Sequence, residues 1–422
     1  MTQPDSGTGL LLSPYRVLDL TDYGCLLCGK ILADLGADVV QVEPPGGSSA
    51  RHLGPFYQDQ VDPEKSLFWW AYAANKRGIT LNLETPQGRE LLKKLVTAAD
   101  FLIESFAPGY LDGLGLGYRD LEAINPGLVM VSITPFGQDG PYAHWKAPDI
   151  VGMAMGGFMY LTGDSDRPPL RVGFPHFYLH GGAAASAGAM IAHTHRAATG
   201  QGQHVDVSCQ QAVAKTLAHA PQSWDIEGVV LKRMGVFRQT SGANVVRVNW
   251  ACKDGYVNYV PQGGGSGVAA STRALLAWMD EEGFGDEYLE SVNWEELGYG
   301  QVRTEVMDKA VGPLQRFFAT QTRAELTKAS LERRILLFPV ATQSDILDHP
   351  QLEARDYFRS LPHDELGTTV TYPGAFVKDR TGDRVGLRRR PPLIGEHNQE
   401  IYQKELGLTT AELVSLQEEG II

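Results

Sequence analysis

The sequence of 422 residues is poor in cysteine and in basic residues, with four cysteines and 37 Lys and Arg against 50 Asp and Glu. Four cysteines in so long a chain do not form a disulfide framework, which is typical of proteins kept in a reducing compartment. The formal charge of −13 argues against nucleic-acid and membrane-surface binding, because both depend on clustered Lys and Arg. An anionic ligand therefore needs a local basic pocket.

Long apolar runs and a basic leader are also missing. The first twenty residues, MTQPDSGTGLLLSPYRVLDL, have no basic region ahead of their apolar run, and SPYR interrupts that run. We therefore expect neither a signal peptide nor a membrane span, and we expect a cytoplasmic protein.

Signals for metal and dinucleotide binding are weak. Cys25 and Cys28 form a single CxxC, whereas a zinc site needs two further ligands at a matched spacing. His193 and His195 lie two apart on a predicted helix and so face different directions. GLGLGY at 113–118 lacks an acidic ribose partner at the expected distance. We expect no metal and no NAD.

Strands and helices alternate along the first third of the chain. Residues 16–21 and 38–43 read as strands around a helix that ends at Gly36, and ITLNLET, a helix and FLIES repeat the pattern. A helix over 118–125 followed by LVMVSIT repeats it again. Three such units predict an α/β fold with a parallel sheet and helices on both faces. A long helix is predicted over 181–198.

The composition changes near residue 240. GANVVRVNWACKDGYVNYVPQGGGSG predicts two strands joined at Asp254-Gly255, and acidic helical stretches follow. A chain of 422 residues exceeds the length at which one core stops growing. We therefore expect a smaller α+β domain at 240–330. Beyond it, a strand-rich stretch over 367–389 precedes two short helices.

Six segments in order carry a resemblance to a known family. They are LADLGADVVQVEPPGG, ANKRGITLNLETPQGRELLKKL, ESFAPGYLDGLGLGYRDLEAINPGLVMVSITPFGQDGPY, HRAATGQGQHVDVS, FPVATQSDILDHPQLEARDYF and PPLIGEHNQEIYQKELGL. Together they resemble the family III CoA-transferases, which include formyl-CoA transferase, carnitine CoA-transferase and α-methylacyl-CoA racemase. The resemblance implies a Rossmann-like large domain built from 12–225 and a returning C-terminal part at 335–422. It also implies an interlocked-ring dimer.

The resemblance implies a chemistry as well. Members of the family use an Asp that attacks an acyl-CoA thioester and forms a mixed anhydride, then an aspartyl-CoA thioester. Counting back without a gap from Thr199-Gly200 puts that position at Tyr178. A phenol with an ordinary pKa of about 10 is mostly protonated at neutral pH, and an aryl ester cannot become an enzyme-bound CoA thioester. We therefore expect Tyr178 to be a buried aromatic residue in place of the nucleophile.

Other side chains near this position are weaker catalytic candidates. His176 and His180 flank Tyr178 and could act as acid or base, but neither can form the acyl intermediates. Asp149 and Asp164 are alternative carboxylate nucleophiles. Pro148-Asp149 stands where the racemase branch has His-Asp, and proline carries no proton to transfer.

The resemblance also points to CoA-binding groups. Lys146, in GPYAHWKAPD, matches a lysine that contacts CoA in formyl-CoA transferase, and Lys76 and Arg77 match the NKR of the family. QGGGSG resembles in composition a glycine loop that closes over the active site of some members, although a plain turn is an equal alternative. Its candidate residues are Gly263, Gly264 and Gly265.

Two family positions have changed in this sequence. The family usually has the motif ENF followed by a basic residue and PG, and this sequence has Glu104-Ser105-Phe106-Ala107-Pro108-Gly109 there. Before the VEPP-like turn, Gln41 replaces a common Lys.

These features lead to one functional expectation and two alternatives. The sequence looks most like the subunit without a nucleophile in two-subunit members that move CoA from succinyl-CoA to an aryl- or alkylsuccinate during anaerobic hydrocarbon breakdown. We expect a paralogous catalytic partner in a heterodimer or heterotetramer, because an interlocked dimer leaves no stable folded monomer. CoA, its acyl thioester and a small carboxylic acid are the expected ligands. The alternatives are an active homodimer with a displaced carboxylate nucleophile, and a regulatory protein that binds CoA or acyl-CoA.

Overall fold

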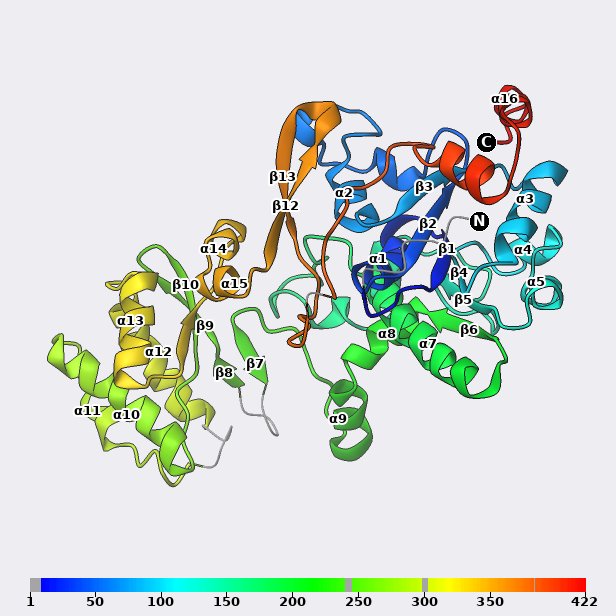
Figure 1. Ribbon diagram of the computed structural model, residues 1–422. Helices are drawn as coiled ribbons and strands as arrows, with labels where there is room; N and C mark the ends of the chain where they lie inside the picture. Colours follow the sequence, from blue (N-terminus) through cyan, green and yellow to red (C-terminus); the bar gives the residue numbers. More distant parts are fainter. Residues whose placement is uncertain (1–8, 240–244, 298–302, 383) are drawn as a thin grey trace. The chain divides into compact units, whose positions relative to one another are not determined.

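The computed structural model describes residues 9–239, 245–297, 303–382 and 384–422, which form two compact units (Figure 1). The first unit contains the described residues up to Gly156 together with Gly173–Thr216 and Pro350–Ile422. The second contains the described residues of Gly157–Val172 and Leu217–His349. Residues 240–244, where the sequence predicts the small domain to begin, lie outside the described residues.

This division differs from the predicted ranges at three segments. Residues 157–172, 217–225 and 335–349, predicted in the large domain, belong to the second unit. Main-chain pairing explains why residues 157–172 belong to the second unit, since the amide of Gly235 donates to the carbonyl of Gly163 at 2.8 Å. The sequence offers no local signal for this long-range pair.

A parallel sheet with the order β3-β2-β1-β4-β5-β6 forms the centre of the first unit. Strands β1 to β5 are buried along almost their whole length, as in a sheet covered on both faces. The predicted α/β fold with a parallel sheet is therefore confirmed. The strands are Arg16–Leu20 (β1), Asp38–Glu43 (β2), Arg77–Thr80 (β3), Phe101–Glu104 (β4), Val129–Thr134 (β5) and Gln203–Ser208 (β6).

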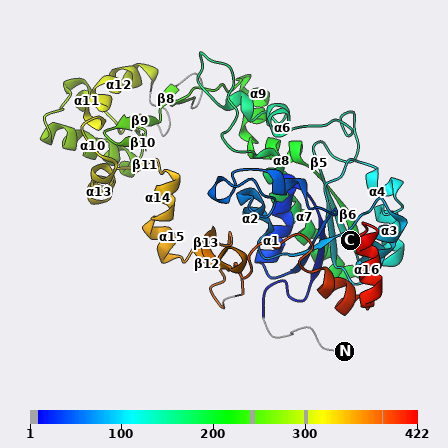
Figure 2. The ribbon, with the colours of Figure 1, turned by 90° about the horizontal axis from the view of Figure 1, so that it is seen from above.

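Helices cover both faces of this sheet (Figure 2). On one face α7 packs against β5, β6 and α1. On the other face α3, α5 and α16 enclose one apolar cluster with Leu18, Leu102 and Met130 of the sheet, and each fully buried side chain of this kind contributes roughly 1.5–3 kcal/mol. The helices of this unit are Leu26–Asp34 (α1), Leu67–Ala73 (α2), Pro86–Val96 (α3), Tyr110–Gly113 (α4), Tyr118–Ile124 (α5), Asp149–Met155 (α6), Phe177–Thr199 (α7), Cys209–Thr216 (α8), Pro350–Ala354 (α15) and Thr410–Glu418 (α16).

The C-terminal part of the chain covers the edge strand β3. The amide of Gly78 donates to Nδ1 of His397 at 3.1 Å, and the amide of Thr80 donates to Oδ1 of Asn398 at 2.9 Å. A π-helix over Gln399–Glu405 follows, and its Tyr402 hydroxyl donates to the carbonyl of Thr80 at 2.7 Å. An exposed sheet edge invites pairing with other chains, so this segment completes the sheet.

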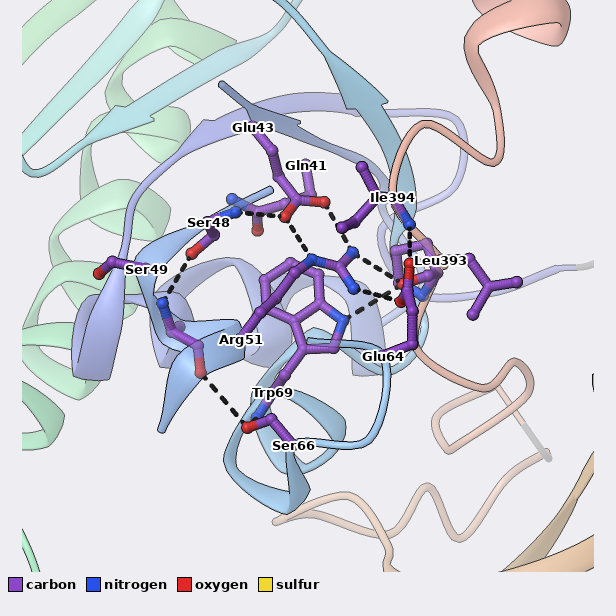
Figure 3. Close-up of polar contacts among 12 residues, drawn as sticks. Gln41, Glu43, Ser48, Ser49, Arg51, Glu64, Ser66, Trp69, Leu393 and Ile394 are labelled. Atoms are coloured by element: carbon purple, nitrogen blue, oxygen red, sulfur yellow. Dashed lines mark hydrogen bonds and ion pairs between the residues drawn. The ribbon is translucent and has the colours of Figure 1, made fainter. Parts of the chain in front are cut away.

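Arg51 joins the same C-terminal segment to the body of the unit (Figure 3). Its fully buried guanidinium donates to Glu43 Oε2 and Glu64 Oε2, at 2.6 Å each, and to the carbonyl of Pro392 at 3.0 Å. It also stacks over the ring of Trp69 at 3.9 Å. A buried guanidinium is stable only when its donors are paired. Here two nearby glutamates and the distant carbonyl of Pro392 supply the acceptors.

The second unit has its own core and antiparallel strands. Among its described residues, Trp250, Trp294 and Phe317 lie in one apolar cluster. The predicted pair of strands joined at Asp254-Gly255 is present as β9 and β10, with β11 beside β10. The elements are Phe237–Gln239 (β7), Val245–Arg247 (β8), Asn249–Cys252 (β9), Gly255–Tyr259 (β10), Leu337–Pro339 (β11), His219–Glu227 (α9), Ser266–Glu281 (α10), Glu287–Ser291 (α11), Thr304–Phe318 (α12), Arg323–Arg333 (α13) and Gln343–Leu347 (α14).

The strand-rich stretch predicted over 367–389 is only partly strand. β12 at Phe358–His363 pairs with β13 at Thr368–Pro373, and the described residues after Pro373 in that stretch form bends and irregular backbone.

Candidate active site

The helix that carries Tyr178 begins earlier than its sequence predicts. α7 starts at Phe177 rather than at residue 181, which places Tyr178 inside its first turn. The carboxylate of Asp149 accepts hydrogen bonds from the amides of His176, at 2.7 Å, and Phe177, at 2.9 Å. The first amides of a helix need such acceptors, and here the acceptor comes from α6 instead of a capping residue next to the helix.

The hydroxyl of Tyr178 is committed to the main chain. It donates to the carbonyl of Ala147 at 2.6 Å. The ring lies edge-on to Tyr23 and Phe177, with centroids 5.5 Å and 5.1 Å away. Burial raises the pKa of the Tyr178 phenol well above its usual value, and nearby Cys25 and Cys209 add to the effect. Tyr178 is therefore a neutral hydrogen-bond donor at physiological pH.

Close backbone approach makes room for this tyrosine. A Cβ at Gly24 would lie 2.8 Å from the Cβ of Tyr178, a distance that would force a shift of the helix or of the turn before α1. We expected Tyr178 to be a buried aromatic residue, but its side chain is only half-buried. The reason is that Tyr178 lines a cavity.

That cavity has a volume of about 740 Å³, within the range of small-molecule sites. Aromatic side chains of Tyr23, Phe106, Trp145 and Tyr178 line it. Lys146 belongs to the lining as well and its side chain is exposed. The cavity thus combines aromatic walls and the ammonium of Lys146 with two carboxylates, Asp22 and Asp149, whose oxygens accept hydrogen bonds from the protein.

The structure brings some of the predicted residues together at this cavity. Asp149 lies in the lining with Tyr178 and Lys146, and it is 7% exposed. Among the described residues, His176 and His180 are not part of the lining. Nδ1 of His180 lies 2.8 Å from the carbonyl of His176, so that nitrogen carries the proton and His180 packs along α7.

Asp164 and the glycine run belong to the second unit. The side chain of Asp164 is exposed. The amide of Gly264 donates to the carbonyl of Trp294 at 2.9 Å, and a Cβ at Gly263 would lie 2.3 Å from the Cβ of Leu297. Gly265 is exposed and precedes α10. Close packing therefore accounts for two of these glycines without a ligand.

Lys76 has a different place from the one predicted. Its ammonium is fully buried and donates to Asp19 Oδ2 at 2.8 Å, Gln41 Oε1 at 2.9 Å and the carbonyl of Leu26 at 3.0 Å. An ammonium has three donors, so all of them have acceptors. A phosphate could reach Lys76 only by breaking a buried ion pair, and we remove Lys76 from the candidate site.

Arg77 is likewise held inside a network of carboxylates. Its guanidinium donates to Asp38 Oδ1 at 2.9 Å, Glu400 at 2.8 Å and Glu405 at 2.7 Å. These groups tie the sheet to the C-terminal segment. Arg77 is also removed from the candidate site, whereas Lys146 remains a predicted phosphate ligand.

The aromatic lining was not predicted, although the sequence holds a signal for it. Tyr23 follows the end of β1 and Phe106 follows the end of β4. Trp145 lies on the chain after β5. Ligands of open α/β sheets bind outside the carboxyl ends of the strands, so aromatic residues in these loops mark the crevice.

Among the described residues, no group of three or more His, Cys, Asp or Glu side chains could hold a metal ion. Cys25, Cys28 and Cys209 are buried, and burial raises the pKa of the Cys28 thiol. None of the described helices combines the length and apolar character needed to cross a bilayer.

Comparison with known proteins shows the family of the chain. The family model for CoA-transferase family III matches residues 12–398. The chain belongs to CoA-transferase family III. It is 35% identical to the succinyl-CoA:(R)-benzylsuccinate CoA-transferase subunit BbsE of Thauera aromatica, over 97% of this chain and 98% of that protein. It is 30% identical to the succinyl-CoA–D-citramalate CoA-transferase of Chloroflexus aurantiacus, over 97% and 98% of the two chains.

The fold is shared with a solved member of the family. The crystal structure of a CAIB/BAIF family protein from Brucella suis superposes with a TM-score of 0.78 at 29% identity, and the match covers 93% of this chain and 98% of that one. Members of this family are transferases, and their substrates are CoA thioesters.

Proposed function

We propose that this family III chain is the subunit without a nucleophile of a transferase that moves CoA from succinyl-CoA to a dicarboxylic acid, such as an aryl- or alkylsuccinate. A paralogous chain supplies the Asp nucleophile in a heterodimer or heterotetramer, and the two chains interlock. The expected setting is the cytoplasm of a cell that degrades hydrocarbons anaerobically.

The environment of Tyr178 carries this proposal. Its hydroxyl is bound to the carbonyl of Ala147 at 2.6 Å, and burial raises its pKa further from neutrality. The family mechanism needs a carboxylate whose own carbonyl carbon accepts CoA as a thioester. A neutral phenol held by the main chain has no such carbon, and Tyr178 fills the position at which the sequence count places the Asp.

The choice of acids rests on the relatives. Two of them are named as transferases of succinyl-CoA with benzylsuccinate or citramalate, and one of these is named as a subunit. The cavity next to Tyr178 has aromatic walls and Lys146 beside the carboxylates of Asp22 and Asp149. The aromatic walls and the ammonium offer contacts to an acid that has an apolar group. Both acceptors are dicarboxylic acids, and an arylsuccinate adds an aromatic group to the same pattern.

The first test is CoA transfer from succinyl-CoA to a panel of dicarboxylic acids, by the chain alone and by the chain co-expressed with its nearest genomic paralogue. We expect transfer only in the co-expressed sample. Changing the nucleophilic Asp of the paralogue to Asn abolishes transfer, whereas Tyr178→Phe leaves it within about twofold, because the Tyr178 hydroxyl is bound to the main chain and takes no part in the acyl transfer. Tyr256→Phe, an exposed tyrosine, is the matched control. Robust transfer by the chain alone would contradict the proposal.

Two alternatives give different results in separate measurements. An active homodimer with a displaced carboxylate would yield an acyl hydroxamate on Asp149 or Asp164 after incubation with acyl-CoA and hydroxylamine, seen by mass spectrometry. Asp149 is the stronger of the two because it lines the cavity. A regulatory protein would bind CoA tightly in calorimetry and show no turnover with any paralogue.

A further inference from the structure

A second polar cluster lies beside the active-site cavity and takes no part in the chemistry above. Glu104, at the end of β4, is 4% exposed and lines a smaller cavity of about 170 Å³. Burial raises the pKa of this carboxyl from its usual value of 4.5 to about 7. Glu104 therefore changes its charge within the physiological range of pH.

The carboxylate of Glu104 holds one wall of the larger cavity. Its Oε2 accepts a hydrogen bond from the amide of Phe106 at 2.6 Å. The segment from Ser105 to Pro108 lines the active-site cavity. At its first residue, the hydroxyl of Ser105 accepts from the amide of Asp22 at 3.0 Å. The wall is thus fixed at two adjacent points, and only the bond to Glu104 depends on a titrating group.

Ser132 and His204 lie next to Glu104 on the way to the surface. The Ser132 hydroxyl lowers the pKa of Glu104 as a hydrogen-bonding neighbour, and its Oγ lies 2.8 Å from Nε2 of His204. His204 is exposed, and its ring stacks on Tyr118 with centroids 5.4 Å apart. Both the hydroxyl and the imidazole can reverse donor and acceptor roles. These two side chains can therefore carry a proton between the buried carboxyl and solvent.

The neighbours of Glu104 include groups that raise its pKa and groups that lower it. Asp112 of α4 and Asp206 of β6 raise its pKa through their negative charge, while the bonds from Ser132 and the Phe106 amide lower it. Arg119 of α5 lines the same small cavity, is exposed, and favours the ionised form. Partial desolvation lowers the pKa of His204 itself, so His204 is neutral while Glu104 titrates.

We propose that Glu104 is a positioning residue: its ionised carboxylate holds the Ser105–Pro108 wall of the active-site cavity, and its proton exchanges with solvent through Ser132 and His204. Protonation replaces the charge-assisted bond to the Phe106 amide by a neutral and weaker one, so the wall loosens as the pH falls. This inference rests on the proposed function only where it identifies the ligand of the cavity as CoA or its thioesters.

The test measures how firmly the Phe106 amide is held in the Ser105–Pro108 wall, and it needs no ligand. Hydrogen exchange of peptides that cover residues 101–110 is followed by mass spectrometry and corrected for the intrinsic effect of pH. At about pH 8 the Phe106 amide should exchange roughly tenfold faster in Glu104→Gln than in the natural chain, and near pH 5.5 the two should agree, because the neutral amide mimics the protonated carboxyl. Glu90→Gln, an exposed glutamate on α3, should behave as the natural chain at both values.

A second measurement covers the case in which Glu104→Gln does not fold. Infrared spectra of the natural chain labelled with 13C-glutamate should show a protonated carboxyl whose signal disappears with a midpoint near about pH 7. Ser132→Ala removes a bond that favours the ionised form, so it should move this midpoint upward. Equal exchange of Glu104→Gln and the natural chain at about pH 8, or no protonated glutamate signal near neutral pH, overturns the proposal.

Calorimetry with CoA separates this inference from the proposed function. We expect the affinity for CoA to fall more between about pH 8 and about pH 5.5 in the natural chain than in Glu104→Gln. Equal losses in the two chains overturn the coupling of Glu104 to the ligand. Absence of CoA binding at both pH values counts against CoA as the ligand of this cavity, while exchange at Phe106 still decides the role of Glu104.

Discussion

The hydroxyl of Tyr178 and the main-chain carbonyl of Ala147 are joined by a hydrogen bond of 2.6 Å. This bond ties the first turn of α7 to the segment that leads into α6, and the carboxylate of Asp149 repeats the connection two residues later through the amides of His176 and Phe177. Tyr178, which the sequence count predicts at the nucleophile position of the family, thus joins two segments of the chain.

Tyr178→Phe tests the mechanical part of this role. The variant leaves the carbonyl of Ala147 without its donor in a partly buried place, and we expect a loss of about 1 kcal/mol in the free energy of unfolding. Denaturant titration of the two chains measures it. A loss of several kcal/mol would mean that the hydroxyl supports more of the structure than this one bond, and no loss would mean that water replaces it.

Gly24→Ala should disturb the same region by a steric route. The new Cβ would lie 2.8 Å from the Cβ of Tyr178 and 3.2 Å from the amide of Leu179, and an overpacked contact of this kind costs roughly 1–3 kcal/mol. Gly113→Ala is the control, because a Cβ at Gly113 meets no atom within 4 Å. Thermal unfolding should separate the two variants, and equal melting temperatures would contradict the close approach.

Arg51→Met should be strongly destabilising. It leaves the carboxylate of Glu43, which is fully buried as a side chain, without its cation, and breaking a buried ion pair by removing one partner costs roughly 3–5 kcal/mol. Arg380→Met, at an exposed position, should stay within about 0.5 kcal/mol of the natural chain. Chemical denaturation measures both. A small effect of Arg51→Met would show that water reaches Glu43.

Glu104 should make the stability depend on pH in a defined direction. Its pKa is about 7 in the folded chain against a usual 4.5, so the folded state binds the proton more tightly than the unfolded state. The contribution is complete below about pH 4.5 and is lost as the pH rises through about 7, for a total on the order of 3 kcal/mol. The unfolding free energy of the natural chain should therefore fall as the pH rises through this range, and that of Glu104→Gln should lack this slope. A slope that persists in Glu104→Gln would assign it to another group.

Parts of the fold could be predicted from local sequence patterns. The strands at 16–21 and 38–43 match β1 and β2 almost residue for residue, because fully buried parallel strands are continuous apolar runs bounded by turn residues. The pair of strands joined at Asp254-Gly255 follows from its turn in the same way. Each of these signals lies within a few residues of the element that it predicts.

The errors arise where distant segments meet. Lys76 matched a family motif, but its acceptors Asp19, Leu26 and Gln41 lie 35 to 57 residues away in the sequence. The start of α7 was placed late because its cap, Asp149, comes from another helix. Counting along the chain predicts the nucleophile position at Tyr178, but it could not predict the bond to Ala147, since no periodicity records a side chain that meets a carbonyl 31 residues earlier.

The return of the C-terminal segment to β3 and Arg51 also sets an order of events during synthesis. Strand β3 is made early, but the residues that pair with its edge begin near His397, and the acceptor from Pro392 completes the contacts of Arg51. While the ribosome translates the second unit, the first unit therefore has an open sheet edge and an incompletely paired buried cation. Such half-finished sheets expose surfaces that aggregate. A nascent chain arrested before Pro392 should accordingly bind chaperones, and release should follow once the segment through Asn398 has emerged.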